Sequence, residues 1–211
     1  ALGDIDESGV AAVADAESIE RFAEQVVDDF GSVDICAPNA GVIGAPDFES
    51  RIGHVEADWN ATRNINVMGT VNLLESLRPV PALKTVVAIT TDKVYDNREW
   101  PWPYRETDPL GGHEPYGASK AAVHFLTRNL AVRLARKGLT VNAIAPGPFE
   151  SKMMAHTLAQ FQDRIEKENP MGRIGSPRDM AGLALFLASS AATYMTGQVI
   201  ALDGGRHLGS A

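Results

Sequence analysis

The sequence predicts an α/β fold built on a parallel sheet with helices covering both faces. Short, largely apolar stretches typical of buried strands alternate along the chain with longer stretches in which apolar residues recur at helical spacing. Such alternation is typical of parallel strands joined by helical crossovers. The chain has 211 residues, of which 45% are hydrophobic, so we expect residues 1–211 to form a single domain with a substantial core.

The first half of the chain contains two predicted helices and two predicted strands. A helix is expected over 18–30, where apolar residues share one face and Gly31 follows as a stop. The apolar stretches 33–37 and 85–89 predict strands, and a long helix over 57–77 lies between them. The residues expected on the buried faces of the two helices are Ile19, Phe22, Ala23, Val26, Val27, Trp59, Ile65, Val67, Leu73, Leu74 and Leu77.

The second half begins with a long loop. Residues 90–115 are rich in Pro, Gly, Trp and charged side chains, and a loop of this length is typically functional. A second long helix is predicted over 116–136, and Gly138 closes it. The elements expected after it are a strand over 139–145, helices over 156–168 and 177–189, and a strand over 198–202.

Charge and composition argue against several classes of protein. The formal net charge is -8 and no Lys/Arg cluster is large, so we expect no nucleic-acid partner; the basic residues from Arg128 to Lys137 are interpreted as a solvated helix face. No apolar run approaches the roughly 20 residues needed to cross a bilayer, so we expect no membrane partner. The single Cys36 and the lack of a signal-like start predict a cytoplasmic location. We assign no metal site.

Tyr116 and Lys120 are the candidate catalytic pair. They are four residues apart at the start of the predicted helix 116–136, so both side chains leave the same face, one turn apart. A nearby ammonium group favours the phenolate and lowers a tyrosine pKa from about 10 towards neutral pH. Tyr116 is therefore a candidate general acid/base. Because this spacing occurs by chance in many helices, its context decides the interpretation.

Short motifs surround this pair in a definite order. Asn39-Ala40-Gly41 follows one predicted strand, Asn66 lies in the long helix, Thr90-Thr91 ends the next strand, and Pro146-Gly147 follows the strand beyond Tyr116. In this order and spacing, the chain resembles the short-chain dehydrogenase/reductase family over nearly its whole length. The resemblance implies a Rossmann-like, doubly wound sheet. It also implies an NAD(P)-dependent oxidoreductase that transfers a hydride between nicotinamide and a small carbonyl or secondary-alcohol substrate.

The resemblance implies roles for individual residues. Tyr116 would donate or accept the proton, and Lys120 would bind the nicotinamide ribose while lowering the pKa of Tyr116. Thr91 would hydrogen-bond the substrate oxygen, and Asn66 would support a water relay behind Lys120. Taken singly, Asn66 could instead bend its helix, Thr91 could be a cap and Asn39 a turn former. The positions implied to contact the cofactor are Asp4, Asn39, Ala40, Gly41, Lys120, Pro146, Gly147 and Ser151.

Two features depart from the family pattern. The sequence contains no Gly-rich turn of the family's pyrophosphate-binding kind, so we expect the N-terminal βαβ unit to be truncated. Asp4 resembles the acidic residue that selects NAD, which predicts NAD as the cofactor with NADP as the alternative; a charged terminal tail is the other interpretation. Residues 92–112 resemble CDP-glucose 4,6-dehydratases, with Asp92 as the acid that helps to expel water.

These departures leave two alternatives open, a nucleotide-sugar 4,6-dehydratase with bound NAD and a catalytically inactive scaffold subunit. The flanking motifs, Asn39-Ala40-Gly41 and residues 141–147, resemble the simple single-domain reductases and favour the oxidoreductase. By the same resemblance, helices 57–77 and 116–136 would associate copies of the chain into a homodimer or homotetramer.

Overall fold

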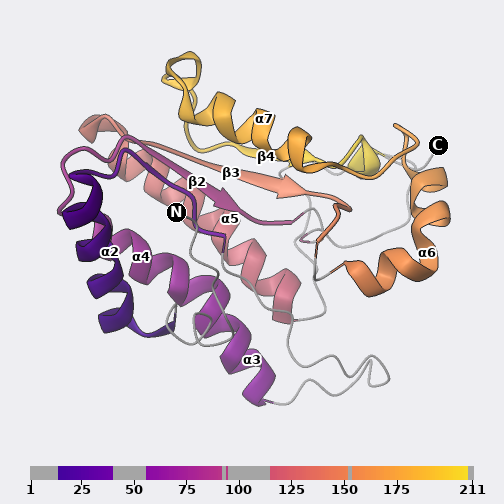
Figure 1. Ribbon diagram of the computed structural model, residues 1–211, viewed down its shortest axis with the longest axis horizontal. Helices are drawn as coiled ribbons and strands as arrows, with labels where there is room; N and C mark the ends of the chain where they lie inside the picture. The colour runs from indigo at the N-terminus through magenta and orange to yellow at the C-terminus, as the bar shows by residue number, and fades with distance from the viewer. Residues whose placement is uncertain (1–13, 40–55, 92–93, 95–114, 152–153, 209–211) are drawn as a thin grey trace.

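The computed structural model describes residues 14–39, 56–91, 94, 115–151 and 154–208. Within them, four parallel strands form one sheet in the order β1-β2-β3-β4, with helices on both faces (Figure 1). The predicted α/β, Rossmann-like fold is confirmed. No helix among the described residues has the length and apolar character needed to cross a bilayer. The strands are β1 (Ile35–Cys36), β2 (Thr85–Ile89), β3 (Thr140–Pro146) and β4 (Val199–Leu202).

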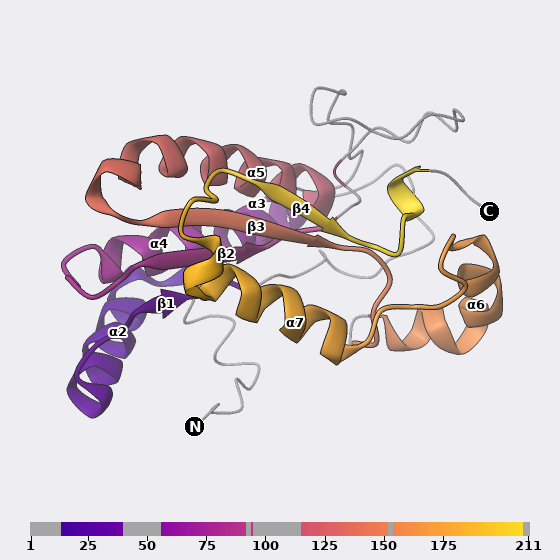
Figure 2. The same ribbon diagram turned by 90° about the horizontal axis from the view of Figure 1, so that it is seen from above.

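The helices form one layer on each face of the sheet. Helices α2, α4 and α5 cover one face, and α7 covers the other, as the two views agree (Figures 1 and 2). Helix α6 lies beyond the end of the sheet where β3 finishes (Figures 1 and 2). The longer helices are α2 (Ala16–Phe30), α3 (Glu56–Arg63), α4 (Gly69–Leu77), α5 (Pro115–Leu134), α6 (Ala155–Glu168) and α7 (Pro177–Ala188).

Strand β2 shows why the core has two halves. Its side chains alternate, so Val86 packs among the residues of α2, α4 and α5, whereas Val87 packs against α7. The adjoining β3 follows the same alternation, because Val86 pairs with Val141 and Ile89 with Ile144. This register sends the side chain of every second residue of β2 towards α5.

Local sequence signals set the helix ends. Asp15 caps α2 by accepting from the backbone N–H groups of the first turn, and Gly31 ends it with a left-handed φ of 80°. Helix α7 begins with Pro177 after a capping box in which Ser176 and Asp179 exchange side-chain and backbone hydrogen bonds. These ends lie within two residues of those predicted.

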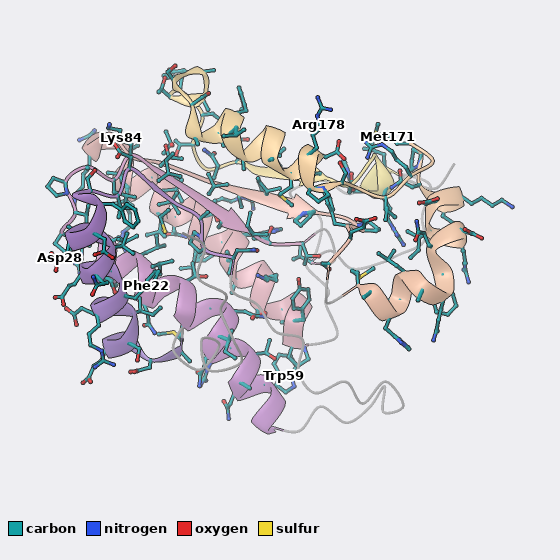
Figure 3. All side chains as sticks on the ribbon, in the orientation of Figure 1. Phe22, Asp28, Trp59, Lys84, Met171 and Arg178 are labelled. Atoms are coloured by element: carbon teal, nitrogen blue, oxygen red, sulfur yellow. The ribbon has the colours of Figure 1, made fainter. Side chains whose placement is uncertain are left out.

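Three predictions about the first half of the chain were wrong in detail. The strand expected over 33–37 is reduced to Ile35–Cys36, and the helix expected over 57–77 is interrupted by a π-helical turn, Asn64–Met68. Two residues assigned to the core are exposed, Phe22 at 59% and Trp59 at 43% (Figure 3). Burial of a helix face depends on what packs against it, which periodicity within one helix does not specify.

Candidate active site

Helix α5 buries an unusual number of polar side chains. Ser119, Lys120, His124 and Thr127 are each less than 8% exposed, although buried helix positions are normally apolar. Each of them makes a hydrogen bond, which offsets the free-energy cost of removing it from water. A polar row on a buried helix face is a local inconsistency of the kind found at functional sites.

Lys120 joins α5 to β2. Its side-chain Nζ donates a hydrogen bond of 3.0 Å to the backbone oxygen of Ile89, the last residue of β2, and the residue is only 4% exposed. Burial lowers the pKa of the Lys120 ammonium group to about 8. The same Nζ lies 5.9 Å from the ring centroid of Tyr116, which is half-buried one turn earlier. The predicted Tyr116–Lys120 pair therefore shares one face of α5.

Thr91 and Asn39 lie beyond the carboxyl ends of adjacent strands. Thr91 follows β2 and is 6% exposed, two residues after the carbonyl that binds Lys120. Asn39 follows β1 and is exposed, and the neighbouring Pro38 oxygen accepts a hydrogen bond of 3.0 Å from the Ile89 N–H. Parallel strands bring these ends to one edge of the sheet, where ligands of α/β folds bind.

Asn66 lies in the π-helical turn and is fully buried. Its Nδ2 donates a hydrogen bond of 2.9 Å to Ser119 Oγ, and Ser119 Oγ donates one of 2.8 Å to the backbone oxygen of Tyr116. The side chain of Asn66 thus supports the first turn of α5. π-Helical turns are rare and occur often at functional sites. This contact was not part of the predicted water relay, which stays a prediction.

The remaining predicted cofactor contacts lie near the end of β3 or outside the described residues. Pro146 ends β3, and the Gly147 N–H donates a hydrogen bond of 3.1 Å to the oxygen of Leu202. The exposed Ser151 accepts a hydrogen bond of 3.1 Å at its Oγ from the Met154 N–H, just before α6. The predicted residues Asp4, Ala40, Gly41 and Asp92 lie outside the described residues.

Two residues of this cluster were missed. Thr90 and His124 are each 2% exposed, and Thr90 Oγ1 lies 2.8 Å from His124 Nε2. A signal was present in the sequence, because Tyr116, Lys120 and His124 are spaced at i, i+4 and i+8 and so follow one face of a helix.

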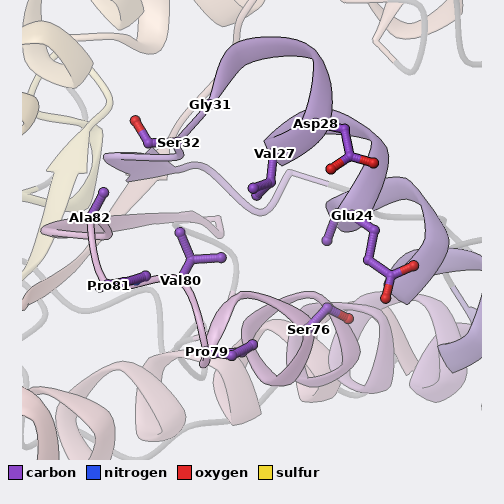
Figure 4. A pocket seen from close by; sticks show the side chains of 11 residues that line it. Glu24, Val27, Asp28, Gly31, Ser32, Ser76, Pro79, Val80, Pro81 and Ala82 are labelled. Carbon is purple, nitrogen blue, oxygen red and sulfur yellow. The ribbon is translucent and has the colours of Figure 1, made fainter.

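A cavity of about 780 Å³ lies elsewhere in the molecule, between α2 and the connection from α4 to β2 (Figure 4). Val27 and Val80 stand on opposite walls of it (Figure 4). It opens near the amino end of β2, whereas Lys120 binds the carboxyl end of that strand. A smaller cavity of about 150 Å³ lies beside the carboxyl end of β4, where Phe149 and Leu202 line it. The chemistry-bearing residues therefore do not share the larger cavity.

Comparison with known proteins identifies the family. A family profile described as enoyl-(acyl carrier protein) reductase matches residues 7–207. The chain belongs to the short-chain dehydrogenase/reductase family. It is 32% identical over 197 residues to a 3-oxoacyl-(acyl-carrier-protein) reductase of Thermotoga maritima, covering 92% of this chain and 74% of the relative. It is 33% identical over 199 residues to a cyclohexanol dehydrogenase of a Rhodococcus species, covering 92% and 70%.

Solved structures agree with this assignment. The Pseudomonas aeruginosa RhlG/NADP active-site complex superposes with a TM-score of 0.78 at 31% identity, covering 93% of this chain and 75% of that one. A gluconate 5-dehydrogenase from Burkholderia cenocepacia, in complex with NADP and tartrate, gives 0.75 at 29% identity, covering 92% and 72%. Like other short-chain dehydrogenases/reductases, this chain is an NAD(P)-dependent oxidoreductase. Neither the dehydratase nor the scaffold alternative gains support from these comparisons.

The described residues fit the nicotinamide end of such a cofactor. The Lys120 ammonium group has three N–H donors. Among the described residues, its hydrogen bond to Ile89 uses one of them, which leaves the others for ribose hydroxyls. A buried cation of this kind needs further acceptors. For the pyrophosphate, the sequence has no Gly-rich turn of the usual pattern, and no residue is assigned to it.

Proposed function

We propose that Tyr116 exchanges a proton with the substrate oxygen, that Thr91 hydrogen-bonds this oxygen, and that Lys120 binds the nicotinamide ribose. The supporting observation is the position of one side chain. Lys120 is anchored on the last carbonyl of β2, two residues before Thr91, while its Nζ lies 5.9 Å from the Tyr116 ring centroid. When bound, nicotinamide supplies or accepts the hydride.

Electrostatics favours this division of roles. A positive charge near a phenol stabilises the phenolate, and the interaction is stronger at a buried site than in water. Lys120 is 4% exposed, so solvent screens its charge poorly. Asn66 acts on Tyr116 through Ser119, by supporting the turn that carries the tyrosine. Asn39, Pro146, Gly147 and Ser151 are proposed to contact the cofactor, because they lie at or beyond the carboxyl ends of β1 and β3.

The proposed substrate is a small ketone or secondary alcohol. The relatives named above include a 3-oxoacyl-(acyl-carrier-protein) reductase, a cyclohexanol dehydrogenase and a gluconate 5-dehydrogenase. Each of these names describes an enzyme that acts on a ketone or an alcohol. Two hydroxyl-bearing side chains, those of Thr91 and Tyr116, suit a single carbonyl or alcohol oxygen.

We also propose a homodimer or homotetramer and a cytoplasmic location. On α5, Phe125 is 66% exposed and Val132 is 81% exposed, and their spacing of seven residues puts them on one face. In the same helical layer, Trp59 and Met68 are 43% and 41% exposed. Exposed apolar faces of this kind mark surfaces that associate. The cytoplasmic proposal rests on the free, buried Cys36.

Binding and turnover of the expressed chain test the proposal. NADH and NADPH are titrated separately by fluorescence, and their dissociation constants decide between NAD and NADP. Hydride transfer is then followed by nicotinamide absorbance with cyclohexanol and with a 3-oxoacyl thioester. We expect saturable binding and a turnover that Tyr116→Phe removes. Failure to bind either dinucleotide, or conversion of CDP-glucose without net oxidation of NADH, would contradict it.

A further inference from the structure

Behind the candidate catalytic residues, His124 and Thr90 form a buried contact between α5 and β2. His124 Nε2 lies 2.8 Å from Thr90 Oγ1. Thr90 Oγ1 donates a hydrogen bond of 3.0 Å to the backbone oxygen of Ile144 on β3, which also accepts from the Thr90 N–H at 2.8 Å. A hydroxyl carries one proton, so donation to Ile144 leaves the oxygen as an acceptor towards the imidazole. The ring proton then lies on Nε2 of His124.

The imidazole of His124 is neutral at the pH at which such enzymes work. Burial lowers the pKa of His124 to about 4, and the positive charges of Arg128 and Lys120 act in the same direction. A neutral ring protonated on Nε2 remains a donor at all pH values well above its pKa. The hydrogen bond between His124 and Thr90 therefore persists at all pH values well above the pKa of His124.

Like the hydrogen bond of Lys120, this hydrogen bond joins α5 to the end of β2. On α5, Tyr116, Lys120 and His124 occupy successive turns of one face. Lys120 binds the oxygen of Ile89, and His124 binds the side chain of the next residue, Thr90. Two consecutive positions of the chain are thus fixed to α5 immediately before Thr91.

We propose that His124 is a positioning residue for the reaction. By holding Thr90, it fixes the end of β2 against α5 so that the hydroxyl groups of Thr91 and Tyr116 face the same substrate oxygen. The inference rests on the proposed roles of Thr91 and Tyr116. Rates depend steeply on such alignment, since a misplacement of about 1 Å can cost on the order of 100-fold.

Substitutions at both ends of the contact test it. His124→Leu removes the donor, whereas His124→Gln keeps an N–H group at a similar reach; Thr90→Val removes the hydroxyl, and Thr90→Ser keeps it. We expect His124→Leu and Thr90→Val each to lower kcat about tenfold or more, with the dinucleotide dissociation constant changed by less than about twofold. Gln and Ser should restore most of the rate. The double variant should be little slower than either single one, because both remove one interaction.

Thr127→Val is the matched control. Thr127 is 2% exposed on the same helix, but its hydroxyl donates to Val123 of α5 itself, at 2.8 Å. We expect it to lower the free energy of unfolding and to leave kcat of the folded enzyme unchanged. Should His124→Leu behave like this control, or should Gln lose as much rate as Leu, the positioning role would be refuted. If His124→Leu does not fold, the Thr90→Val and Thr90→Ser pair decides by the same criterion.

Nitrogen NMR of the histidine rings gives a readout that does not depend on turnover. We expect His124 to be neutral and protonated on Nε2 near neutral pH, and a ring protonated on Nδ1 would overturn the proposal. An inactive parent protein would contradict the proposed function itself, whereas an active parent with unchanged variants would contradict only the role of His124.

Discussion

Asn66 and Ser119 are 53 residues apart in sequence, yet a hydrogen bond of 2.9 Å joins their side chains. Ser119 passes this restraint to the backbone oxygen of Tyr116. The candidate general acid/base is thus fixed from two sides of α5, by the π-helical turn through Ser119 and by β2 through Lys120. Because these hydrogen bonds fix the position of Tyr116, we expect substitutions of the buried polar residues that make them to lower kcat.

Asn66→Leu is expected to lower both the free energy of unfolding and kcat. The substitution removes a fully buried amide and leaves Ser119 without the donor that the amide supplies, which typically costs about 1–3 kcal/mol. Urea denaturation measures the free energy of unfolding, and kcat is measured on the folded fraction. Asn129→Ala is the control, because Asn129 is exposed on α5. Equal stabilities of the two variants would disprove the structural role of Asn66.

Tyr116→Phe is expected to lower kcat by about 100-fold or more, because general acid–base catalysis commonly contributes 10²–10⁴-fold. The ring and its packing remain, so dinucleotide affinity should change little. Tyr194→Phe provides the comparison, since Tyr194 is fully solvent-exposed. The experiment measures nicotinamide absorbance under saturating substrate. A Tyr116→Phe enzyme as fast as Tyr194→Phe would exclude Tyr116 as the proton donor.

Lys120 predicts how stability depends on pH. Its pKa falls from 10.5 to about 8 on folding, so below pH 8 both states bind the proton and the folded state carries a penalty of about 3 kcal/mol. Between pH 8 and 10.5, only the unfolded chain keeps the proton, so the contribution of Lys120 to stability rises with pH. Lys120→Met should therefore gain stability over the parent at pH 7, less the lost hydrogen bond to Ile89, and this gain should shrink towards pH 10.5.

Chemical denaturation of parent and variant at several pH values measures this difference. Lys84→Met is the control, because the Lys84 side chain is 72% exposed in its ion pair with Asp34. The stability difference between parent and variant should change more with pH for Lys120→Met than for Lys84→Met. A constant difference for Lys120→Met across this pH range would contradict the lowered pKa of Lys120.

Val132→Asp is expected to dissociate the proposed oligomer while leaving the fold intact. Val132 is 81% exposed on α5, so a carboxylate there costs little in the monomer but would be buried in an interface. Light scattering gives the mass, and circular dichroism checks the fold. Phe161→Asp, on α6 and 49% exposed, should leave the mass unchanged. A parent protein that is already monomeric would rule out the proposed assembly.

The sequence predicted most strands and helices well, for identifiable reasons. Strand β2 was predicted at its observed bounds, because residues 85–89 are apolar or β-branched and are bounded by polar residues. Strand β1 was overestimated because only Ile35 and Cys36 pair in register with β2, although Asp34 and Pro38 still accept single backbone hydrogen bonds from it. The interruption of the helix over 57–77 was missed because its apolar periodicity continues across the π-helical turn.

The candidate site also contains one part that the sequence can predict and another that it cannot. The Tyr116–Lys120 pair follows from spacing within one helix and could be found from sequence alone. The Asn66–Ser119 and His124–Thr90 contacts depend on which turn of α5 lies opposite which residue of another element. That register is set by packing of the whole layer, so no local pattern contains it.

The π-helical turn Asn64–Met68 accommodates about one extra residue between α3 and α4. A π-helical turn contains about one residue more than an α-helical turn, yet both complete one revolution, so α3 and α4 keep nearly the same relative rotation. Deleting one residue here would restore a regular helix and would leave Thr62 and Leu77 close to their buried positions. The extra residue therefore changes the path of the helix locally, at Asn66, without displacing the elements on either side.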